Sequence, residues 1–382
     1  MILSADNLKE NSNLVGGLRS AYIVADFGNG GQERQLYNLL TNLPEDFRPI
    51  VIPWDFNPDD RYVAALKDHP GIVVYRLNDA GLIARVREIR KLLKQTQVGF
   101  FHAYSFHLNF IVWMVCFATR IKAIGGIRSR LFLNRSSHGM LRFYLSFLFP
   151  FYKISNNYTC FKGLDKLSLA MAKVFTKTYF VHNGIDLERF HQDKNKPKQA
   201  GEPLKSISVG RLHPVKKVEN IVDWVYRLKQ QNILVSHQHA GHGQRLAQIE
   251  ERIAELGLEK EFLLLGDVQD VPKLFQQAHL FVHAAQHEGC PNVVMEAMAC
   301  GLPVLASNAG DTEHIVDQGQ TGYVYRVDDQ DTMLKFSLGM MEDSNRLKEM
   351  GQLGATKALN KFGIAQYVEA ILQTYHTMGI TI

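Results

Sequence analysis

Residues 281–301 read FVHAAQHEGCPNVVMEAMACG. The apolar residues at the front of this segment, with Leu280 before them, predict a short buried strand. Pro291 and Asn292 predict the start of a helix and Gly301 its end, because proline suits a first helical position and glycine a C-terminal stop. The segment therefore predicts a strand, a tight loop and a helix in direct succession.

Two carboxylates lie within this predicted strand–loop–helix segment. Glu288 falls in the loop, and Glu296 falls in the helix four residues after Asn292, on the face of the helix start. The free N–H groups at a helix start attract phosphate, and carboxylates accept hydrogen bonds from sugar hydroxyls. We interpret the pattern as a site for a phosphorylated sugar ligand. An amphipathic core helix with two solvated glutamates is the alternative that spacing alone leaves open.

Strands and helices alternate in both halves of the chain. In the first half, strands are predicted at residues 20–25, 48–53, 72–75 and 99–103, and helices at 32–43, 62–67 and 82–95. In the second half, strands are predicted at 204–209, 233–239, 261–265, 280–282 and 303–307, and helices at 218–230, 244–256 and 271–278. Repeated βα units predict parallel sheets covered by helices on both faces. The predicted fold class is therefore α/β, with two Rossmann-like βαβ domains.

The domain boundary is predicted near residue 190. Residues 186–203 are polar and typical of a linker. The prediction is an N-terminal domain at 1–190 and a C-terminal domain at 191–361. The last helix, within 362–382, is expected to pack back toward the N-terminal domain.

Composition limits the class of protein. The 382 residues suffice for two domains of ordinary size. None of the four cysteines is spaced C-x2-C, so neither a zinc ribbon nor a disulfide framework is indicated, and a reducing cytoplasm fits. The N-terminal residues do not resemble a secretory signal. The longest apolar stretch has nine residues, whereas a membrane-spanning helix needs about 20, so no transmembrane helix is predicted.

Charge is divided unevenly along the chain. Residues 1–180 carry 23 Lys and Arg against 13 Asp and Glu, and residues 89–164 carry 11 Lys and Arg and no acid. The same region contains the aromatic run LRFYLSFLFPFY at 141–152. Basic residues mixed with aromatics suit an anionic membrane surface, and no nucleic-acid-binding motif accompanies them. We therefore expect the N-terminal domain to contact the inner face of a membrane peripherally, partly through Arg142 and Lys153, and we expect no nucleic acid partner. A buried helix with a solvated basic rim is the alternative.

A glycine-rich turn follows the first long strand. The motif Gly28-Asn-Gly-Gly31 opens a predicted helix, and Gly30 and Gly31 allow a backbone to approach a phosphate or sugar closely. The motif is not G-x-G-x-x-G, because position 33 is Glu, and the chain contains no G-x4-G-K-[ST]. The pattern therefore disfavours a dinucleotide-binding enzyme and a P-loop kinase.

Two cations follow the first strand of the second half. Gly210 ends this strand, Arg211 comes next, and Lys216 follows five residues later. Loops at strand carboxyl ends are where open α/β sheets bind ligands. The planar fork of arginine and the point charge of lysine together suit a diphosphate. Two solvated loop cations are the alternative.

Histidines offer further candidates. His237, His239 and His242 suggest a metal site, but no nearby carboxylate completes a ligand set, so a strand-end loop near a nucleotide is favoured. His102 ends the strand at 99–103 and is expected to point into a cleft between the domains, where a neutral imidazole contacts a hydroxyl. A structural histidine is the alternative for His102.

Six motifs follow one another in a characteristic order: NGGQER, HAYS, VHNGIDLERF, VGRLHPVKK, AGHG and HEGCPNVVMEAMACGLPVLAS. This order resembles family 4 of the retaining glycosyltransferases, which have the GT-B fold. The resemblance covers nearly the whole chain and is strongest over residues 181–324. It implies two Rossmann-like domains that face each other across a cleft.

The resemblance also implies roles for individual residues. Arg211 and Lys216 look like the pair that neutralises the donor diphosphate, and Glu288 looks like the carboxylate beside the transferred sugar. Glu296 looks like the ribose ligand, and His102 matches the residue beside the acceptor and the donor sugar. The other residues of the implied donor site are Gly30, Gly31, Gly210, Gly241, Gly289, Cys290, Pro291 and Asn292.

The implied reaction moves a sugar from a nucleoside diphosphate sugar to a glycan or lipid-linked acceptor in polysaccharide or lipopolysaccharide synthesis. A UDP-sugar is the favoured donor class. Fixed cations and a helix N-terminus would stabilise the leaving diphosphate without a metal or cofactor. The leaving phosphate would help to deprotonate the acceptor on the same face of the sugar. Acceptor recognition is expected at residues 125–157.

Two other classes remain open: a nucleotide-sugar epimerase of the same fold, and a non-catalytic glycan- or lipid-binding relative. The combined presence of the motif cations and the two glutamates argues against both. Three departures from the family pattern are Lys217 in place of a usual Gly, Ala285 in place of a frequent Ser, and a varied glycine pair at 310–313. None removes an expected essential group, so an active enzyme is predicted.

Overall fold

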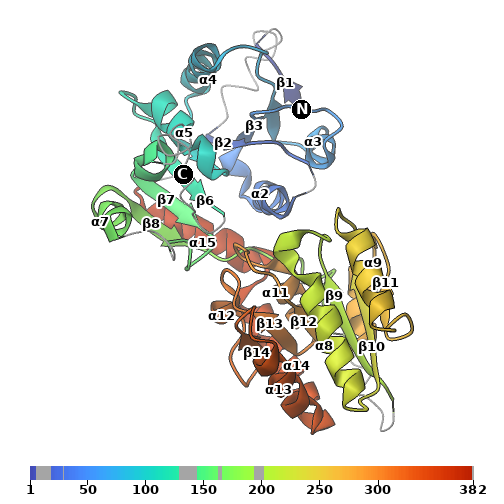
Figure 1. Cartoon of the computed structure of the whole chain (residues 1–382). Coiled ribbons are helices and arrows are strands. Elements are labelled where there is room, and N and C mark those ends of the chain that lie inside the picture. The colour runs from blue at the N-terminus through green and yellow to red at the C-terminus, as the bar shows by residue number, and fades with distance from the viewer. Residues whose placement is uncertain (6–18, 29, 129–143, 162–165, 193–201, 381–382) are drawn as a thin grey trace. The chain divides into compact units, whose positions relative to one another are not determined.

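The computed structural model describes residues 1–5, 19–28, 30–128, 144–161, 166–192 and 202–380. The chain forms two compact units. The first consists of Met1–Gly184 and Ile364–Ile382, and the second of Ile185–Gly363. The chain therefore leaves the first unit once and returns to it at the end (Figure 1).

The first unit contains a sheet whose described strands are all parallel. Their order is β1-β4-β3-β2-β5-β6-β7-β8. The strands are β1 (Ile2–Leu3), β2 (Ser20–Val24), β3 (Pro49–Pro53), β4 (Val73–Tyr75), β5 (Phe100–Ala103), β6 (Lys122–Ile127), β7 (Tyr152–Ser155) and β8 (Lys177–Phe180). Strands β2 to β5 are buried at every residue, as expected for strands that are covered on both faces.

Helices cover both faces of this sheet. One face carries α2 (Gly31–Asn42), α3 (Arg61–Leu66) and α15 (Ile364–Thr377), and the other carries α4 (Leu82–Thr96) and α5 (Asn109–Cys116). A further helix, α7 (Lys166–Phe175), precedes β8. Helix α15 places Tyr367, Ile371 and Tyr375 in the same core as Leu36 and Leu39 of α2. The last helix of the chain therefore belongs to the first unit (Figure 1).

The second unit contains a parallel sheet with the order β11-β10-β9-β12-β13-β14 among the described residues. The strands are β9 (Leu204–Val209), β10 (Val235–Ala240), β11 (Phe262–Leu264), β12 (Leu280–His283), β13 (Val304–Ser307) and β14 (Gly322–Tyr325). Because β9 lies between β10 and β12, the winding of the sheet reverses there. The carboxyl ends of β9 and β12 border the crevice in which open α/β sheets bind ligands.

Helices also cover both faces of the second sheet. One face carries α8 (Val218–Gln230), α9 (Leu246–Glu255) and α13 (Gln330–Met341), and the other carries α10 (Val271–Gln277), α11 (Asn292–Ala299) and α12 (Thr312–Ile315). Helix α14 (Ser344–Lys361) packs against α11. The predicted α/β class with Rossmann-like sheets is confirmed in each unit.

The bounds of the predicted elements fall within two residues of the observed ones, and β9 and α8 coincide with their predictions. Strands β6, β7 and β8 were not predicted, because their basic and aromatic surroundings obscure the strand pattern. The units divide between Gly184 and Ile185, before the predicted boundary near 190, because Ile185 and Phe190 pack in the core of the second unit. Within the part of the chain that the structure describes, every helix is too short or too polar to span a lipid bilayer.

Candidate active site

The predicted donor residues of the second unit lie on loops at the carboxyl ends of β9, β10 and β12, except Asn292 and Glu296, which lie in α11 directly after the β12 loop. Two of these loops are joined directly, because the backbone N–H of Gln286 donates to the carbonyl of Val215 at 2.8 Å. The β12 loop is also held from β13, where the Ser307 hydroxyl donates to the carbonyl of Ala285 at 2.6 Å. The switch point of the sheet therefore holds the cationic loop and the glutamate loop together.

At the centre of this site, Lys216 and Glu288 form an ion pair through Nζ and Oε1. The same Oε1 lies 3.2 Å from Nε2 of His283, the last residue of β12. The side chains of Lys216 and Glu288 are 22% and 15% exposed, so water reaches the pair only partly. The structure therefore brings together two residues that the sequence places 72 positions apart.

The environment keeps Glu288 ionised. Burial by itself would raise the pKa of its carboxyl, but the hydrogen bond from His283 and the charge of Lys216 outweigh burial and lower the pKa to about 2. A carboxylate accepts hydrogen bonds and cannot donate, so Glu288 can orient hydroxyl groups of a ligand. Lys216 offers a cation that an anionic ligand can share or take over.

His283 is the residue of this site that sequence reasoning missed. Its imidazole donates from Nε2 to Glu288, which fixes the carboxylate from the side opposite to solvent, since His283 is only 5% exposed. The Tyr325 hydroxyl donates to the His283 carbonyl at 3.3 Å. The available signal was a polar residue at the end of an otherwise apolar strand.

Helix α11 begins as the sequence predicts, with Pro291 as the residue before its first turn. Cys290 and Pro291 are buried, and Glu296 is buried at 6% exposure in the second turn. The alternative of two solvated glutamates is therefore wrong for Glu296. The loop before the helix is held by a backbone N–H donated from Asp311 to the Gly289 carbonyl at 3.0 Å.

Glycine is required at Gly310, beside this loop. Its φ is +58°, and a Cβ there would lie 2.2 Å from the carbonyl oxygen of Gly289. The close contact keeps the 288–289 backbone against the 310–311 turn. Gly310 is the one glycine left of the pair that is usual in the family. It allows the predicted sugar-binding loop to pack closely against this turn.

The other predicted loop residues lie at the ends of β9 and β10. Gly241 has a φ of +144°, and a Cβ there would lie 2.0 Å from the Gly210 carbonyl oxygen, so the two loops meet backbone to backbone. Arg211 is exposed. Lys217 has a φ of +48°, a left-handed conformation that explains why glycine suits this position in the family.

In the first unit, the glycine-rich turn lies where expected. Gly30 immediately precedes α2 and Gly31 is its first residue. Gln32 donates through Nε2 to the Ser105 hydroxyl at 2.7 Å, just after β5. Strands β2 and β5 are the neighbours at which the first sheet reverses its winding, which again marks a ligand-binding edge.

His102 differs from the prediction. Its side chain is completely buried, with Nδ1 2.8 Å from the Tyr375 hydroxyl of α15, and its ring packs on Tyr22 and Tyr104. Burial, followed by the charge of Arg128, keeps the pKa of His102 well below its usual value. The prediction that this imidazole points into an open cleft is wrong, because the ring faces the core that α15 completes.

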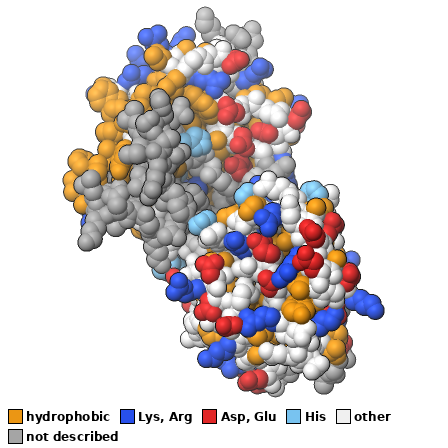
Figure 2. Space-filling model, viewed as in Figure 1, with side chains coloured by type: hydrophobic (Ala, Val, Ile, Leu, Met, Phe, Trp, Pro, Cys, Tyr) orange, Lys and Arg blue, Asp and Glu red, His pale blue; other side chains and the backbone are white. Residues whose placement is uncertain are grey.

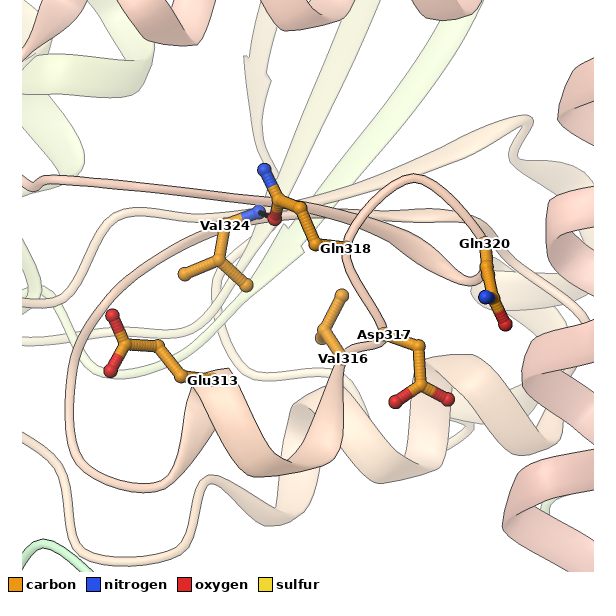
Figure 3. Close-up of a pocket in the computed structure, with 6 residues that line it drawn as sticks. All are labelled: Glu313, Val316, Asp317, Gln318, Gln320 and Val324. Atoms are coloured by element: carbon orange, nitrogen blue, oxygen red, sulfur yellow. Dashed lines mark hydrogen bonds between the residues drawn. The ribbon is translucent and has the colours of Figure 1, made fainter.

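A separate cavity of about 640 Å³ lies on the second unit (Figure 3). Glu313 of α12, Val324 of β14 and the intervening residues Val316, Asp317, Gln318 and Gln320 line it. In Figure 3, the Gln318 side chain bonds the backbone N–H of Val324, at 2.8 Å. None of the predicted donor residues lines this cavity, so it is distinct from the candidate active site. Among the described residues, no group of three or more His, Cys, Asp or Glu is arranged to hold a metal ion.

Comparison with known proteins agrees with this geometry. Residues 189–357 match the family model described as Glycosyl transferases group 1. These residues form a glycosyl transferases group 1 domain. The match contains the β9 loop with its cations, the β12 loop and α11.

Curated relatives support the same family. The lipopolysaccharide core biosynthesis mannosyltransferase LpsB of Rhizobium meliloti (strain 1021) is 29% identical over 53% of this chain and 61% of its own length. The UDP-Gal:alpha-D-GlcNAc-diphosphoundecaprenol alpha-1,3-galactosyltransferase of Escherichia coli is 27% identical over 53% of this chain and 55% of its own length. The chain thus spans about three fifths of the length of the curated relatives it matches.

Solved structures show the same fold over nearly the whole chain. Anabaena Alr3699/HepE, solved in complex with UDP, superposes with a TM-score of 0.78 at 18% identity and covers 94% of this chain and 100% of its own. The predicted GT-B fold, with two parallel α/β units, is confirmed.

Proposed function

We propose that the protein is a retaining glycosyltransferase that moves a sugar from a nucleoside diphosphate sugar, of the UDP class, to a glycan or lipid-linked acceptor. The observation that carries the proposal is the Lys216–Glu288 pair at the switch point of a group 1 domain. Relatives named for mannosyl and galactosyl transfer, and a neighbour that binds UDP, support the donor class. Cell-surface polysaccharide or lipopolysaccharide synthesis is the proposed setting.

The chemistry follows from the charges of the site. The bond between the anomeric carbon and the β-phosphate oxygen breaks, a bond to the acceptor oxygen forms, and the acceptor proton passes to the leaving phosphate. Negative charge that builds on the diphosphate is stabilised by Lys216 and Arg211 and by the positive end of the α11 helix dipole. Glu288 accepts hydrogen bonds from sugar hydroxyls, and Glu296 is proposed to hold the ribose. We propose that these groups suffice without a metal or cofactor.

The donor proposal is tested by thermal shift with UDP, GDP, ADP and their sugars. We expect one nucleotide, UDP, to stabilise the protein, and Lys216→Ala to abolish that shift. Lys260→Ala is the matched control, because Lys260 is an exposed cation of the same unit outside the site. A shift that survives Lys216→Ala would remove Lys216 from the donor site, and the absence of any nucleotide shift would contradict the proposal.

The retaining mechanism and the independence from a metal are tested with the reaction itself and its product. Once the donor is known, NMR of the product gives its anomeric configuration, and inversion would contradict the retaining mechanism. Turnover in excess EDTA tests metal independence, which predicts no loss. Consumption of donor with formation of a second nucleotide sugar, in the absence of acceptor, would instead identify an epimerase.

We propose further that the first unit contacts an anionic membrane surface through an edge patch. This patch consists of Phe151, Lys173, Val174, Phe175 and Lys177, which are all exposed around the start of β7 and β8. Figure 2 shows hydrophobic side chains along the left-hand edge of this unit, where α7 lies in Figure 1. Apolar side chains flanked by lysines suit the boundary between lipid headgroups and acyl chains.

The predicted contribution of Lys153 to this contact is wrong. Its side chain is fully buried and donates through Nζ to the carbonyl of Pro150. Arg142, and the part of the expected acceptor region at 129–143, lie outside the described residues.

The edge patch is tested by sedimentation with phosphatidylglycerol vesicles. We expect the double variant Lys173→Glu and Lys177→Glu to bind at least several-fold more weakly, and the difference to shrink at high salt because salt screens exposed charges. Lys260→Glu in the second unit serves as the control for charge alone. Equal binding of wild type and the double variant would contradict the edge patch.

A further inference from the structure

Two serines and two histidines form a continuous chain of hydrogen bonds between β9 and β10. Ser206 Oγ lies 2.9 Å from His237 Nδ1, and His237 Nε2 lies 2.9 Å from Ser208 Oγ. Ser208 Oγ lies 2.7 Å from His239 Nδ1, and His239 Nε2 lies 3.0 Å from the Gly210 carbonyl oxygen. This chain of hydrogen bonds therefore runs from inside the sheet to Gly210, the first residue of the loop that carries Arg211.

Strand register explains the geometry. His237 pairs with Ser206 and His239 with Ser208 across the parallel strands, so all four side chains lie on one face of the sheet. All four are buried. Apolar residues are the usual occupants of central parallel strands, and a buried polar group without a partner costs free energy. Each of these groups has a partner within the chain of bonds, which is why the arrangement is stable.

The Gly210 carbonyl determines which atom donates and which accepts in every hydrogen bond of this chain of bonds. A carbonyl oxygen only accepts, so His239 Nε2 carries a proton and donates it to Gly210. Nδ1 of neutral His239 then accepts from the Ser208 hydroxyl, whose oxygen accepts from His237 Nε2–H. His237 Nδ1 in turn accepts from the Ser206 hydroxyl. Both imidazoles are thus neutral Nε2–H tautomers, and burial lowers their pKa values in agreement with this state.

The end of the chain of bonds lies on the proposed donor site. The backbone of Gly210 is held at three points: its N–H donates to the Ala240 carbonyl at 2.9 Å, its carbonyl accepts from His239, and Gly241 packs against that carbonyl. The Gly210 carbonyl belongs to the peptide group that joins Gly210 to Arg211, so the bond from His239 sets the direction in which the polypeptide continues to Arg211. Two further backbone bonds, from Leu212 to His242 and from His213 to Arg211, continue the same turn at 3.0 and 2.8 Å.

We infer that His239 is a positioning residue for the phosphate-binding turn: its Nε2–H, oriented by Ser208 and His237, holds the Gly210 carbonyl so that Arg211 is presented to the donor diphosphate. This inference rests on the proposed function for the purpose of the turn. The histidine does not contact the nucleotide; it acts through the backbone. The chain of bonds explains why polar residues occupy these strand positions, where packing alone favours apolar ones.

The test compares two substitutions that each keep one half of the imidazole. His239→Gln retains a donor near the Nε2 position, and His239→Asn retains a polar atom near Nδ1 but does not reach Gly210. We expect UDP affinity to stay within about 2-fold of wild type in the Gln variant and to fall about 10-fold in the Asn variant, the change expected from one lost hydrogen bond. Ser206→Ala is the matched control, because it breaks the far end of the same chain of bonds. It should lower stability and leave UDP affinity unchanged.

Equal UDP affinity in the Gln and Asn variants would overturn the inference, and so would an equal loss in Ser206→Ala, which would indicate a general effect of destabilisation. A second readout does not depend on nucleotide binding. Nitrogen-15 NMR of the histidines should show His237 and His239 as Nε2–H tautomers, and an Nδ1–H tautomer at His239 would overturn the inference. Failure of wild type to bind UDP or any other nucleotide, with the tautomers as expected, would contradict the proposed function and leave the hydrogen-bond assignment standing.

Discussion

At the scale of single residues, the candidate site depends on an ion pair that is largely shielded from water. Glu288 accepts a hydrogen bond from His283 and forms an ion pair with Lys216. These two contacts lower the pKa of the Glu288 carboxyl to about 2. The carboxylate is therefore ionised at neutral pH. Its negative charge also holds Lys216 in place before an anionic ligand arrives.

Substitution Glu288→Gln keeps the shape of the side chain and removes its charge. We expect turnover to fall by about 100-fold or more, since preorganised electrostatic contacts of this kind contribute on that scale. Steady-state kinetics measures the loss, and circular dichroism checks that the fold is retained. Glu250→Gln on the exposed side of α9 is the control. Near-normal turnover after Glu288→Gln would remove Glu288 from the site.

The buried His239 makes stability depend on pH. Burial lowers its pKa from an ordinary value of 6.5 to about 4. Between these values the unfolded chain binds a proton and the folded chain does not, so stability falls as the pH is lowered from 6.5 toward 4. At pH 5 this one group accounts for a loss on the order of 2 kcal/mol.

His239→Gln should therefore reduce the pH dependence. Urea unfolding at pH 7 and pH 5 should give a difference between the two pH values that is smaller by about 2 kcal/mol in the variant than in wild type. The quantity compared is the change in the free energy of unfolding between pH 7 and pH 5. A change in stability that is the same at both pH values therefore does not affect it. Identical slopes would show that His239 titrates normally in the folded protein.

At the scale of elements, the site depends on how loops leave the strands. Lys217 occupies a left-handed conformation, with a φ of +48°, directly before α8. An L-residue in this conformation costs about 1 kcal/mol or more, whereas glycine adopts it freely. The Nζ atom of this lysine also lies 3.8 Å from Oε1 of Glu219 in a partly exposed ion pair, which contributes little.

Lys217→Gly should stabilise the protein by about 0.5 kcal/mol, because relief of the left-handed strain exceeds the entropy that glycine adds to the unfolded chain. Lys335→Gly inside α13 gives the contrast, since glycine in a regular helix should cost about 1 kcal/mol. Urea unfolding measures both. Destabilisation of the same size in both variants would show that the strain at Lys217 is negligible.

Elements with a strong local pattern could be predicted from the sequence, and those that depend on distant packing could not. Strand β9 and helix α8 have uninterrupted periodicity, and both were located to the residue. Strand β7 contains a fully buried lysine, Lys153, so its sequence resembles a surface segment. For the site, glycine and proline spacing predicted the loop before α11. The orientation of His102 could not be predicted, because the tyrosine that it contacts comes from a helix 273 residues away.

At the scale of the whole molecule, α15 is the element that completes the first unit. Its Tyr367, Val368, Ile371 and Tyr375 are buried in the core beside α2, and Lys122 of β6 donates to the carbonyl of Gly379 at 2.7 Å. Four large side chains in one core represent several kcal/mol of hydrophobic stabilisation at about 1.5–3 kcal/mol each. The first unit therefore depends on residues that are distant in sequence.

A chain that ends at Gly363 should lose the first unit and keep the second. We expect amides of β2 and β5 to lose their protection in hydrogen exchange, while amides of β9 and β12 keep theirs. A chain that ends at Gly379 retains α15 and is the control. Protection of β2 and β5 that survives removal of α15 would contradict the dependence.

The return of the chain to its first unit also has a consequence for synthesis on the ribosome. The second unit, Ile185–Gly363, is translated in full before translation of α15 begins. The N-terminal unit, although made earlier, waits with an uncovered apolar face until α15 has left the exit tunnel. Its exposure to chaperones is therefore set by the time needed to translate the entire second unit.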